Sequence, residues 1–195
     1  NETSSQKDRT IRRETITPRE AGDWILSGPH FFVGTPFNKS PRDPCRNNKD
    51  YDEVDLIIIP DNYLPRTNYI PSCSPDEYLD RTPSFHDKPV TDRYRHVHRK
   101  MLAITGERTM IPAIIPPLAG HTDGVVSIAF LDSSDLLLLS SMASSLPVDF
   151  FVRTQGRSNL QPGSSKTLPL ARTGSAFALL MSARVLRLNS LTSHY

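Results

Sequence analysis

Proline is the residue that most limits what this chain can fold into. The sequence has 17 prolines in 195 residues, nearly double the usual share of about 5%. Because proline breaks helix interiors, a bundle of long helices is excluded. Hydrophobic residues make up 37% of the chain, which is enough for a core in one sizeable domain or two very small ones. We expect short elements and long loops.

Charge is spread unevenly along the chain, although the net charge is only +2. Residues 43–80 carry 3 Lys/Arg against 9 Asp/Glu, a net charge of −6. Residues 81–108 carry 7 Lys/Arg against 3 Asp/Glu, a net charge of +4. A local basic segment of this kind is hidden by the charge of the whole chain, and it is typical of a surface that contacts phosphates.

Membrane association and disulfide bonding are not favoured by the sequence. No run of 18 uncharged apolar residues occurs, so we expect no membrane partner. Cys45 and Cys73 lie 28 positions apart and form no CxxC motif. Two free thiols in a cytoplasmic chain are the simplest interpretation, and one disulfide is the alternative.

Turn residues and apolar runs predict the elements of the first half of the chain. Residues 1–16 are polar and predict a flexible lead-in. Thr17, Pro18 and Glu20 match a capping box, which predicts a short helix over 18–27. The other predicted segments are strands at 30–37 and 54–60 and loops at 38–53 and 60–90.

Hydrophobic periodicity is clearer in the second half. The segment 92–104 (DRYRHVHRKMLAI) is ambiguous, and we interpret it as a strand with His96 and His98 on one face and Arg95 and Arg99 on the other. The remaining predictions are strands at 109–115, 125–131 and 165–170, and helices that begin near Ser133 or Ser134, at Pro147, and over 175–191.

These elements predict the α+β class, with a small mixed or antiparallel sheet, short helices and long loops. The strands and helices do not alternate regularly, so a doubly wound fold is not expected. We divide the chain into a flexible lead-in (1–16), one domain (17–170) and a C-terminal helix (171–195) that can link to a missing part.

Common catalytic motifs are absent from the sequence. It contains no GxGxxG, no P-loop, no GxSxG and no Asn-Pro-Pro-Tyr-type motif. His96 and His98 share a strand face and could bind a metal together with a carboxylate such as Asp92, which makes a small metal-dependent hydrolase one alternative. A third ligand at a suitable spacing is not evident.

Two basic stretches have the residue types that contact nucleic acids. Lys and Arg neutralise phosphates, Arg can read guanine, and Asn or Gln can read adenine. A solvated charged face is the alternative interpretation of the same residues. The candidate DNA contacts are Arg93, Arg95, His96, His98, Arg99, Lys100 and Arg108 in the first stretch, and Arg153, Gln155, Arg157 and Asn159 in the second.

Several segments together resemble the large single-chain DNA adenine-N6 methyltransferases, which include type IIG restriction-modification enzymes and methyltransferases of phage-exclusion systems. The resemblance covers patches of residues 18–170. The segments that carry it are GPHFFVGTPFNKSPR, DLIIIPDNYLPRTNY, YRHVHRKMLAITGERTMIPAIIPP and SSLPVDFFVRTQGRSNL. The most specific of them holds Arg99, Met101, Glu107, Arg108, Thr109, Pro116 and Pro117.

The resemblance implies a target-recognition-domain-like fold and a role in reading DNA. The family's methyl-donor-binding and adenine-gripping motifs are missing here, so this chain would bind double-stranded DNA without catalysing a reaction or holding a cofactor. S-adenosylmethionine would be bound by a methyltransferase catalytic domain in the same parent chain. A protein-interaction or structural module of a restriction complex is the other alternative.

Overall fold

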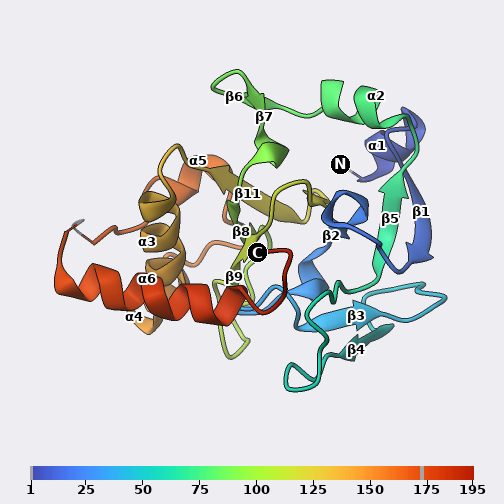
Figure 1. Cartoon of the computed structure of the whole chain (residues 1–195). Coiled ribbons are helices and arrows are strands. Elements are labelled where there is room, and N and C mark those ends of the chain that lie inside the picture. Colours follow the sequence, from blue (N-terminus) through green and yellow to red (C-terminus); the bar gives the residue numbers. More distant parts are fainter. Residues whose placement is uncertain (1, 172–173) are drawn as a thin grey trace.

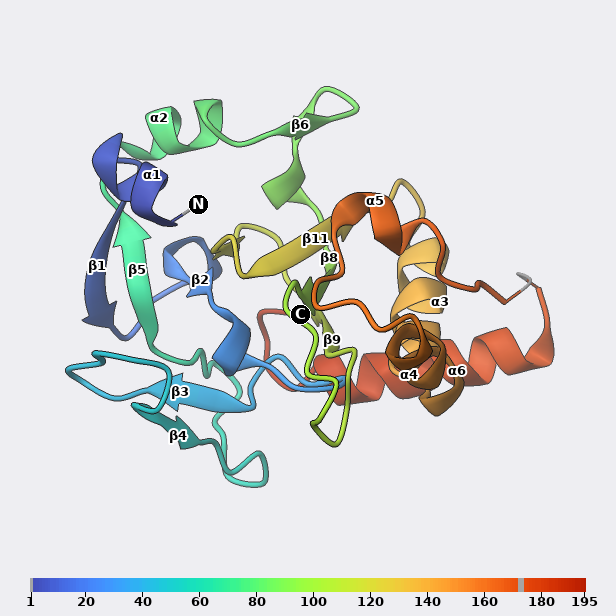
Figure 2. The same cartoon turned by 180° about the vertical axis from the view of Figure 1, so that it is seen from behind.

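A three-stranded antiparallel sheet lies between two groups of smaller elements in the computed structural model, which describes residues 2–171 and 174–195 (Figures 1 and 2). Its strand order is β11–β8–β9. The central strand β8 (Arg95–Arg99) pairs with β9 (Pro112–Ile115) on one edge and with β11 (Val125–Ala129) on the other. The chain therefore has the mixed α+β class that its sequence predicts.

The other described strands form four two-stranded pairs. Three pairs are antiparallel, and the pair of β2 with β10 is parallel. The pairs are β1 (Ile11–Ile16) with β5 (Thr67–Pro71), β3 (Lys39–Pro41) with β4 (Tyr51–Glu53), β6 (Ser84–Phe85) with β7 (Lys88–Pro89), and β2 (Ile25–Leu26) with β10 (Gly120–His121).

The helices are short, as the proline content predicts. The α-helices are α1 (Glu2–Lys7), α2 (Pro75–Asp80), α3 (Ser133–Ala143), α4 (Leu146–Thr154), α5 (Pro162–Ser165) and α6 (Ala176–Asn189), and the 3-10 helices are η1 (Ala21–Asp23), η2 (Gly28–His30) and η3 (Val90–Asp92). Helix α3 packs against α6 and against strands β8 and β9. In Figure 1, helices α3, α4 and α6 lie to one side of the central sheet, and the β1–β5 and β3–β4 pairs lie to the other.

Two hydrophobic clusters lie on opposite faces of strand β8. Val97 belongs to the first cluster, with Trp24, Phe31 and Phe37. The second is formed mainly by α3, α4 and the segments around Met110 and Leu160, and it contains Leu139, Val148 and Val152. Because β8 is the middle strand and both of its faces are covered, four of its five residues are buried.

The second half of the chain follows the sequence prediction closely. Strands β8, β9 and β11 and helices α3, α4 and α6 all lie within the predicted segments, give or take a residue. Serine hydroxyls cap two of these helices: Ser145 accepts from the Val148 amide and Ser175 from the Ala178 amide. Asp132, rather than Ser133 or Ser134, caps α3. The predicted strand at 165–170 is wrong, because α5 ends at Ser165 and residues 166–170 form turns and irregular backbone.

Three helices or strands predicted in the first half do not form. The segment 18–27 forms η1 and β2 instead of a helix, because Trp24, Ile25 and Leu26 are all buried and an amphipathic helix buries only one face. The segment 30–37 is a turn around Gly34, which has a φ of 72°. The apolar segment 54–60 is an exposed loop, in which Asp55 Oδ1 accepts from the Ile57 amide at 3.0 Å.

Segments predicted to be flexible or loop-like contain regular structure. Residues 2–16 form α1 and β1, and β1 pairs with β5 from the predicted 60–90 loop. Strands β3 and β4 form a hairpin within the predicted 38–53 loop. Cys45 and Cys73 are both free thiols. Within the described residues no single helix is long and apolar enough to cross a bilayer, although α3 and α4 taken together, bent by 68°, reach that length and composition.

Candidate nucleic-acid interface

Three of the predicted DNA contacts lie inside the protein. Arg95 is 2% exposed, and His96 and His98 are fully buried. The predicted division of the strand is confirmed, because both histidines point toward α3 and α5, and Arg95 and Arg99 point to the opposite face. The expectation that these side chains meet DNA is corrected: in the middle strand of a covered sheet, neither face is open to a duplex.

The two histidines form a directed chain of hydrogen bonds. His98 Nε2 lies 3.3 Å from the Leu160 carbonyl oxygen, which can only accept, so this nitrogen carries a proton. His98 Nδ1 then accepts from His96 Nε2 at 3.4 Å, and His96 Nδ1 accepts from the Ser140 hydroxyl at 3.0 Å. Burial lowers the pKa of His98 to about 4. The pKa of His96 is also lowered, mainly by burial and to a smaller extent by repulsion from a charge on His98. Both rings are therefore neutral and structural.

Arg99 ties the central sheet to the segment after β2. Its Nε donates to the Gly28 carbonyl at 2.7 Å and its Nη2 to the Phe31 carbonyl at 2.6 Å. The guanidinium carbon lies 5.7 Å from the centre of the Phe31 ring. Burial lowers the pKa of this arginine below its ordinary value. Arg99 is thus a structural contact rather than a free phosphate ligand.

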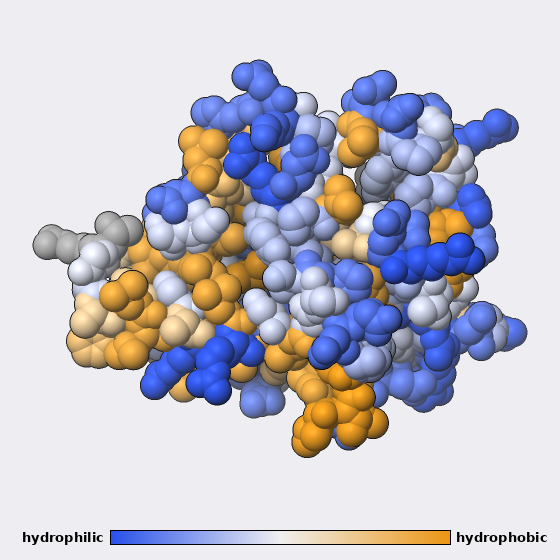
Figure 3. Space-filling view, in the orientation of Figure 1, coloured by the Kyte–Doolittle hydropathy of each residue, from blue (hydrophilic) through white to orange (hydrophobic). Residues whose placement is uncertain are grey.

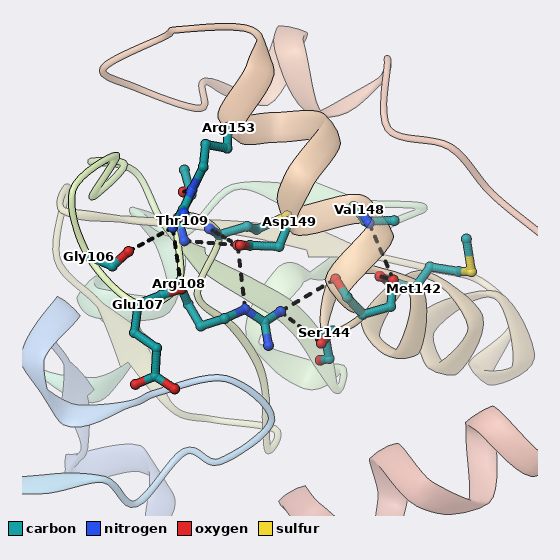
Figure 4. A network of polar contacts seen from close by, with 11 residues as sticks. Gly106, Glu107, Arg108, Thr109, Met142, Ser144, Val148, Asp149 and Arg153 are labelled. Carbon is teal, nitrogen blue, oxygen red and sulfur yellow. Dashed lines mark hydrogen bonds and ion pairs between the residues drawn. The ribbon is translucent and has the colours of Figure 1, made fainter.

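Arg108 and Arg153 belong to a second internal network, which Figure 4 shows. The buried Asp149 of α4 accepts from the Thr109 amide at 2.8 Å and from the Met110 amide at 2.7 Å. Arg108 Nε lies 3.6 Å from the same carboxylate oxygen, and its Nη2 donates to the Ser144 carbonyl at 2.9 Å. Arg153 Nε donates to the Thr109 hydroxyl at 2.8 Å. Both arginines therefore hold the loop before β9 against α3 and α4.

Two further candidates, Arg93 and Gln155, are partly buried. The Arg93 guanidinium lies 5.6 Å from the centre of the Phe85 ring, and its Nε is buried without a hydrogen-bond partner in the described part of the chain. Gln155 forms the C-cap of α4, and its Oε1 is likewise buried without a partner there. Neither side chain is fully open to a duplex.

The two predicted stretches meet at one edge of the molecule. The Leu160 amide donates to the Lys100 carbonyl at 2.8 Å, and the Leu102 amide donates to the Ser158 carbonyl at 2.9 Å. Between these bonds, Met101 and Asn159 form an antiparallel bridge. We call residues 100–104 and 156–160 the recognition edge.

Several side chains of this edge are accessible. Met101 is 75% exposed, and Arg157 and Asn159 are exposed. Lys100 lies 3.0 Å from Asp123, and Arg157 donates to the Ser164 hydroxyl at 2.7 Å. Surface contacts of this kind are weak and can be exchanged for contacts to DNA. Of the predicted contacts, the edge therefore brings Lys100, Arg157 and Asn159 together.

A groove of about 390 Å³ runs beside the recognition edge. Residues 101–103 line one wall, and Asn47 and Asn48 line the facing wall, in the loop between β3 and β4. In this loop Arg46 and Lys49 are also exposed. Hydrogen bonds from the amides of Arg46 and Asn47 to Asp50 lower the pKa of that carboxyl and fix the turn.

The sequence interpretation missed this second wall. Its only signal is the tetrapeptide 46–49 (Arg-Asn-Asn-Lys), which has two cations beside two amides. The net charge of −6 over residues 43–80 hid it. Most of those carboxylates lie elsewhere or have partners of their own: Asp52, for example, lies 2.6 Å from Arg42.

A metal centre and a family assignment find no support. Among the residues that the structure describes, no group of three or more His, Cys, Asp or Glu side chains is arranged to hold a metal ion. In comparisons with known proteins, no family model and no curated protein sequence matches this chain.

Proposed function

We propose that this chain is the DNA-binding, sequence-recognising portion of a DNA adenine-N6 methyltransferase and is not catalytic by itself. The observation that carries the proposal is the groove between the recognition edge and the Arg46–Lys49 loop. Asn47, Asn48 and Met101 line the groove directly, and exposed residues lie next to them: Arg46 and Lys49 flank the two asparagines in the chain, and Asn159 pairs with Met101 across the edge. That combination serves both parts of DNA recognition, since cations hold the backbone and amides read bases.

Each side of the groove has a defined chemical role in this proposal. Arg46, Lys49 and Arg157 neutralise phosphates, which supplies affinity that falls with salt. The Asn48 and Asn159 amides donate and accept hydrogen bonds at base edges, with adenine as the base that such an amide pairs with best. The buried histidines and arginines of β8 support this surface from below rather than contact DNA.

The methyltransferase part of the proposal is supported by the sequence resemblance. In the intact protein, a separate catalytic domain would bind S-adenosylmethionine and methylate the adenine. Such enzymes act on a base that has been flipped out of the duplex. The chain described here would place the target adenine within reach of that domain.

Equilibrium binding to a fluorescent duplex at several salt concentrations tests the proposal. We expect binding that weakens between about 50 and about 200 mM salt. The double substitution Lys49→Ser/Arg157→Ser should reduce the slope of log K against log salt by about 2, because two phosphate contacts are lost. Arg187→Ser, at an exposed position of α6, is the matched control and should leave the slope unchanged. Equal slopes for all three proteins would contradict the proposed interface.

Docking onto another protein domain is a second candidate function, and exposed apolar side chains favour it. Phe177 and Leu179 of α6 are 77% and 74% exposed, and Leu146 and Phe150 of α4 are 70% and 67% exposed. Figure 3 shows apolar surface gathered over this helical side of the molecule. Soluble domains rarely leave so many large apolar side chains open without a partner. Crosslinking of the intact parent protein should connect α6 to its catalytic domain, and crosslinks from the recognition edge alone would contradict this role.

A further inference from the structure

A second cavity lies on the opposite face of β8 from the histidine chain. It has a volume of about 370 Å³, is open to solvent on one side, and is lined by residues of α1, α2, η3, β10 and the central sheet. Figure 1 shows these elements arranged around the region between the two sides of the molecule. Arg95, Thr91 and Tyr78 are among its polar lining residues, and Ile11, Ile25 and Val90 are among its apolar ones.

Arg95 is a buried cation without a counterion. Its Nη2 donates to the Ala119 carbonyl and its Nε lies 3.4 Å from the Arg93 carbonyl. In the part of the chain that the structure describes, it forms no ion pair, and Nη1 has no hydrogen-bond partner. Removing an arginine from water is costly unless an anion compensates the charge. The side chain nonetheless lines a cavity and is only 2% exposed.

Two hydroxyl groups on the cavity wall also have unused hydrogen-bonding capacity. Thr91 Oγ1 is buried and has no partner within residues 2–171 and 174–195. Tyr78 Oη forms no hydrogen bond to any described residue. A Cβ placed on Gly120 would lie 2.7 Å from this oxygen, so the glycine leaves the space that the tyrosine hydroxyl occupies. A buried cation and an unpartnered tyrosine hydroxyl that line the same cavity indicate a ligand that supplies an acceptor.

The other charged groups of the cavity are mostly paired with residues around it. Arg81 lies 2.5 Å from Glu77, and Asp123 lies 3.0 Å from Lys100. Glu2 lines the cavity without an ion pair to any described residue, and its negative charge repels an incoming anion. The remaining strong cation is Arg95, which therefore dominates the recognition of a ligand.

We propose that this cavity binds a phosphate ester of a small molecule, with Arg95 as the main phosphate ligand and Tyr78 as a hydroxyl donor. A guanidinium fork matches two oxygens of a phosphate, and the Tyr78 hydroxyl can donate to a third. The apolar wall formed by Ile11, Ile25 and Val90 suits the organic part of the ester. Because Arg95 is only 2% exposed, a small molecule reaches it more easily than the backbone of a duplex does.

Calorimetric titration with inorganic phosphate and with phenyl phosphate tests the proposal at constant ionic strength. We expect phenyl phosphate to bind with a Kd of about 1 mM or tighter, and more tightly than inorganic phosphate. Tyr78→Phe should weaken binding by about tenfold, because it removes one hydrogen bond to a charged group. Glu2→Gln should strengthen binding, because it removes a negative charge. Tyr69→Phe, in the other groove, is the matched control and should have no effect.

The outcomes separate this site from the DNA groove. Displacement of phenyl phosphate by inorganic phosphate, but not by a duplex, supports a small-molecule site. Displacement by a duplex would assign the same pocket to a backbone phosphate. No binding of either phosphate, binding of phenol as tight as that of phenyl phosphate, or affinities equal in Tyr78→Phe, Glu2→Gln and the wild-type chain would overturn the proposal. None of these variants replaces a residue of the central sheet, so loss of folding does not confuse the result.

Discussion

Acid should unfold this protein because its core holds neutral histidines. His98 has a pKa of about 4 in the folded chain, lowered mainly by burial, and His30 has the same value for the same reason. The ordinary value in an unfolded chain is about 6.5. Between these values the unfolded chain binds more protons, so acid favours unfolding. Stability from the neutral histidines is therefore complete above about pH 6.5 and is lost as the pH falls toward about 4.

The magnitude follows from the size of the shift. A pKa difference of about 2.5 corresponds to about 3 kcal/mol for each histidine over the full range, and to about 2 kcal/mol at about pH 5. Two such residues, His30 and His98, lose about 4 kcal/mol at about pH 5, which is a large part of the 5–15 kcal/mol typical of a domain. Protonation of His98 also places two N–H groups face to face across the contact with His96.

Urea unfolding at several pH values provides the assay. The free energy of unfolding should fall by about 4 kcal/mol or more between about pH 7 and about pH 5. His98→Gln should lower stability at neutral pH, but should reduce the further loss at about pH 5 by about 2 kcal/mol. His86→Asn is the control, since His86 is exposed and its φ of 50° suits asparagine. An unfolding free energy that does not change over this range would refute the neutral histidine chain.

Two further substitutions test the packing. Asp149→Ala should destabilise the protein by about 3 kcal/mol in denaturant unfolding, because the buried Thr109 and Met110 amides lose their acceptor; a change below about 0.5 kcal/mol would contradict the network in Figure 4. Ile57→Ser/Ile58→Ser should change the free energy of unfolding by less than about 0.5 kcal/mol, because these side chains are 92% and 77% exposed. A large loss of stability in the second variant would show that this loop packs in solution.

The later elements were predictable from sequence because their patterns are local. Ser175 caps α6, and apolar residues repeat along that helix at helical spacing. The strand at Arg95–Arg99 and its two faces also follow from simple alternation. The first half was not predictable, because its apolar run at 54–60 belongs to a loop, and β1 finds its partner β5 more than 50 residues away. Pairing at that distance leaves no local signal.

The sequence identified some exposed residues of the candidate interface, but it could not distinguish them from the buried ones. Alternating charge along β8 is compatible both with an exposed strand and with a covered middle strand. Nothing in the sequence shows that Arg95 and Arg99 donate hydrogen bonds to backbone carbonyls. The structure brings Lys100, Arg157 and Asn159 together at one edge, although no sequence feature indicated that the two basic stretches adjoin. The facing loop could be found only from the folded chain, since it lies within a segment of net negative charge.

Photo-crosslinking to a labelled duplex tests the proposed DNA interface most directly. Met101→p-benzoyl-phenylalanine places the probe in the groove, at a position that is 75% exposed. The same probe in place of Phe177, which is 77% exposed on α6, is the matched control. The account predicts that the probe at position 101 crosslinks to DNA and the probe at position 177 does not. Crosslinking from position 177 alone, or from neither position in a chain that binds the duplex, would contradict it.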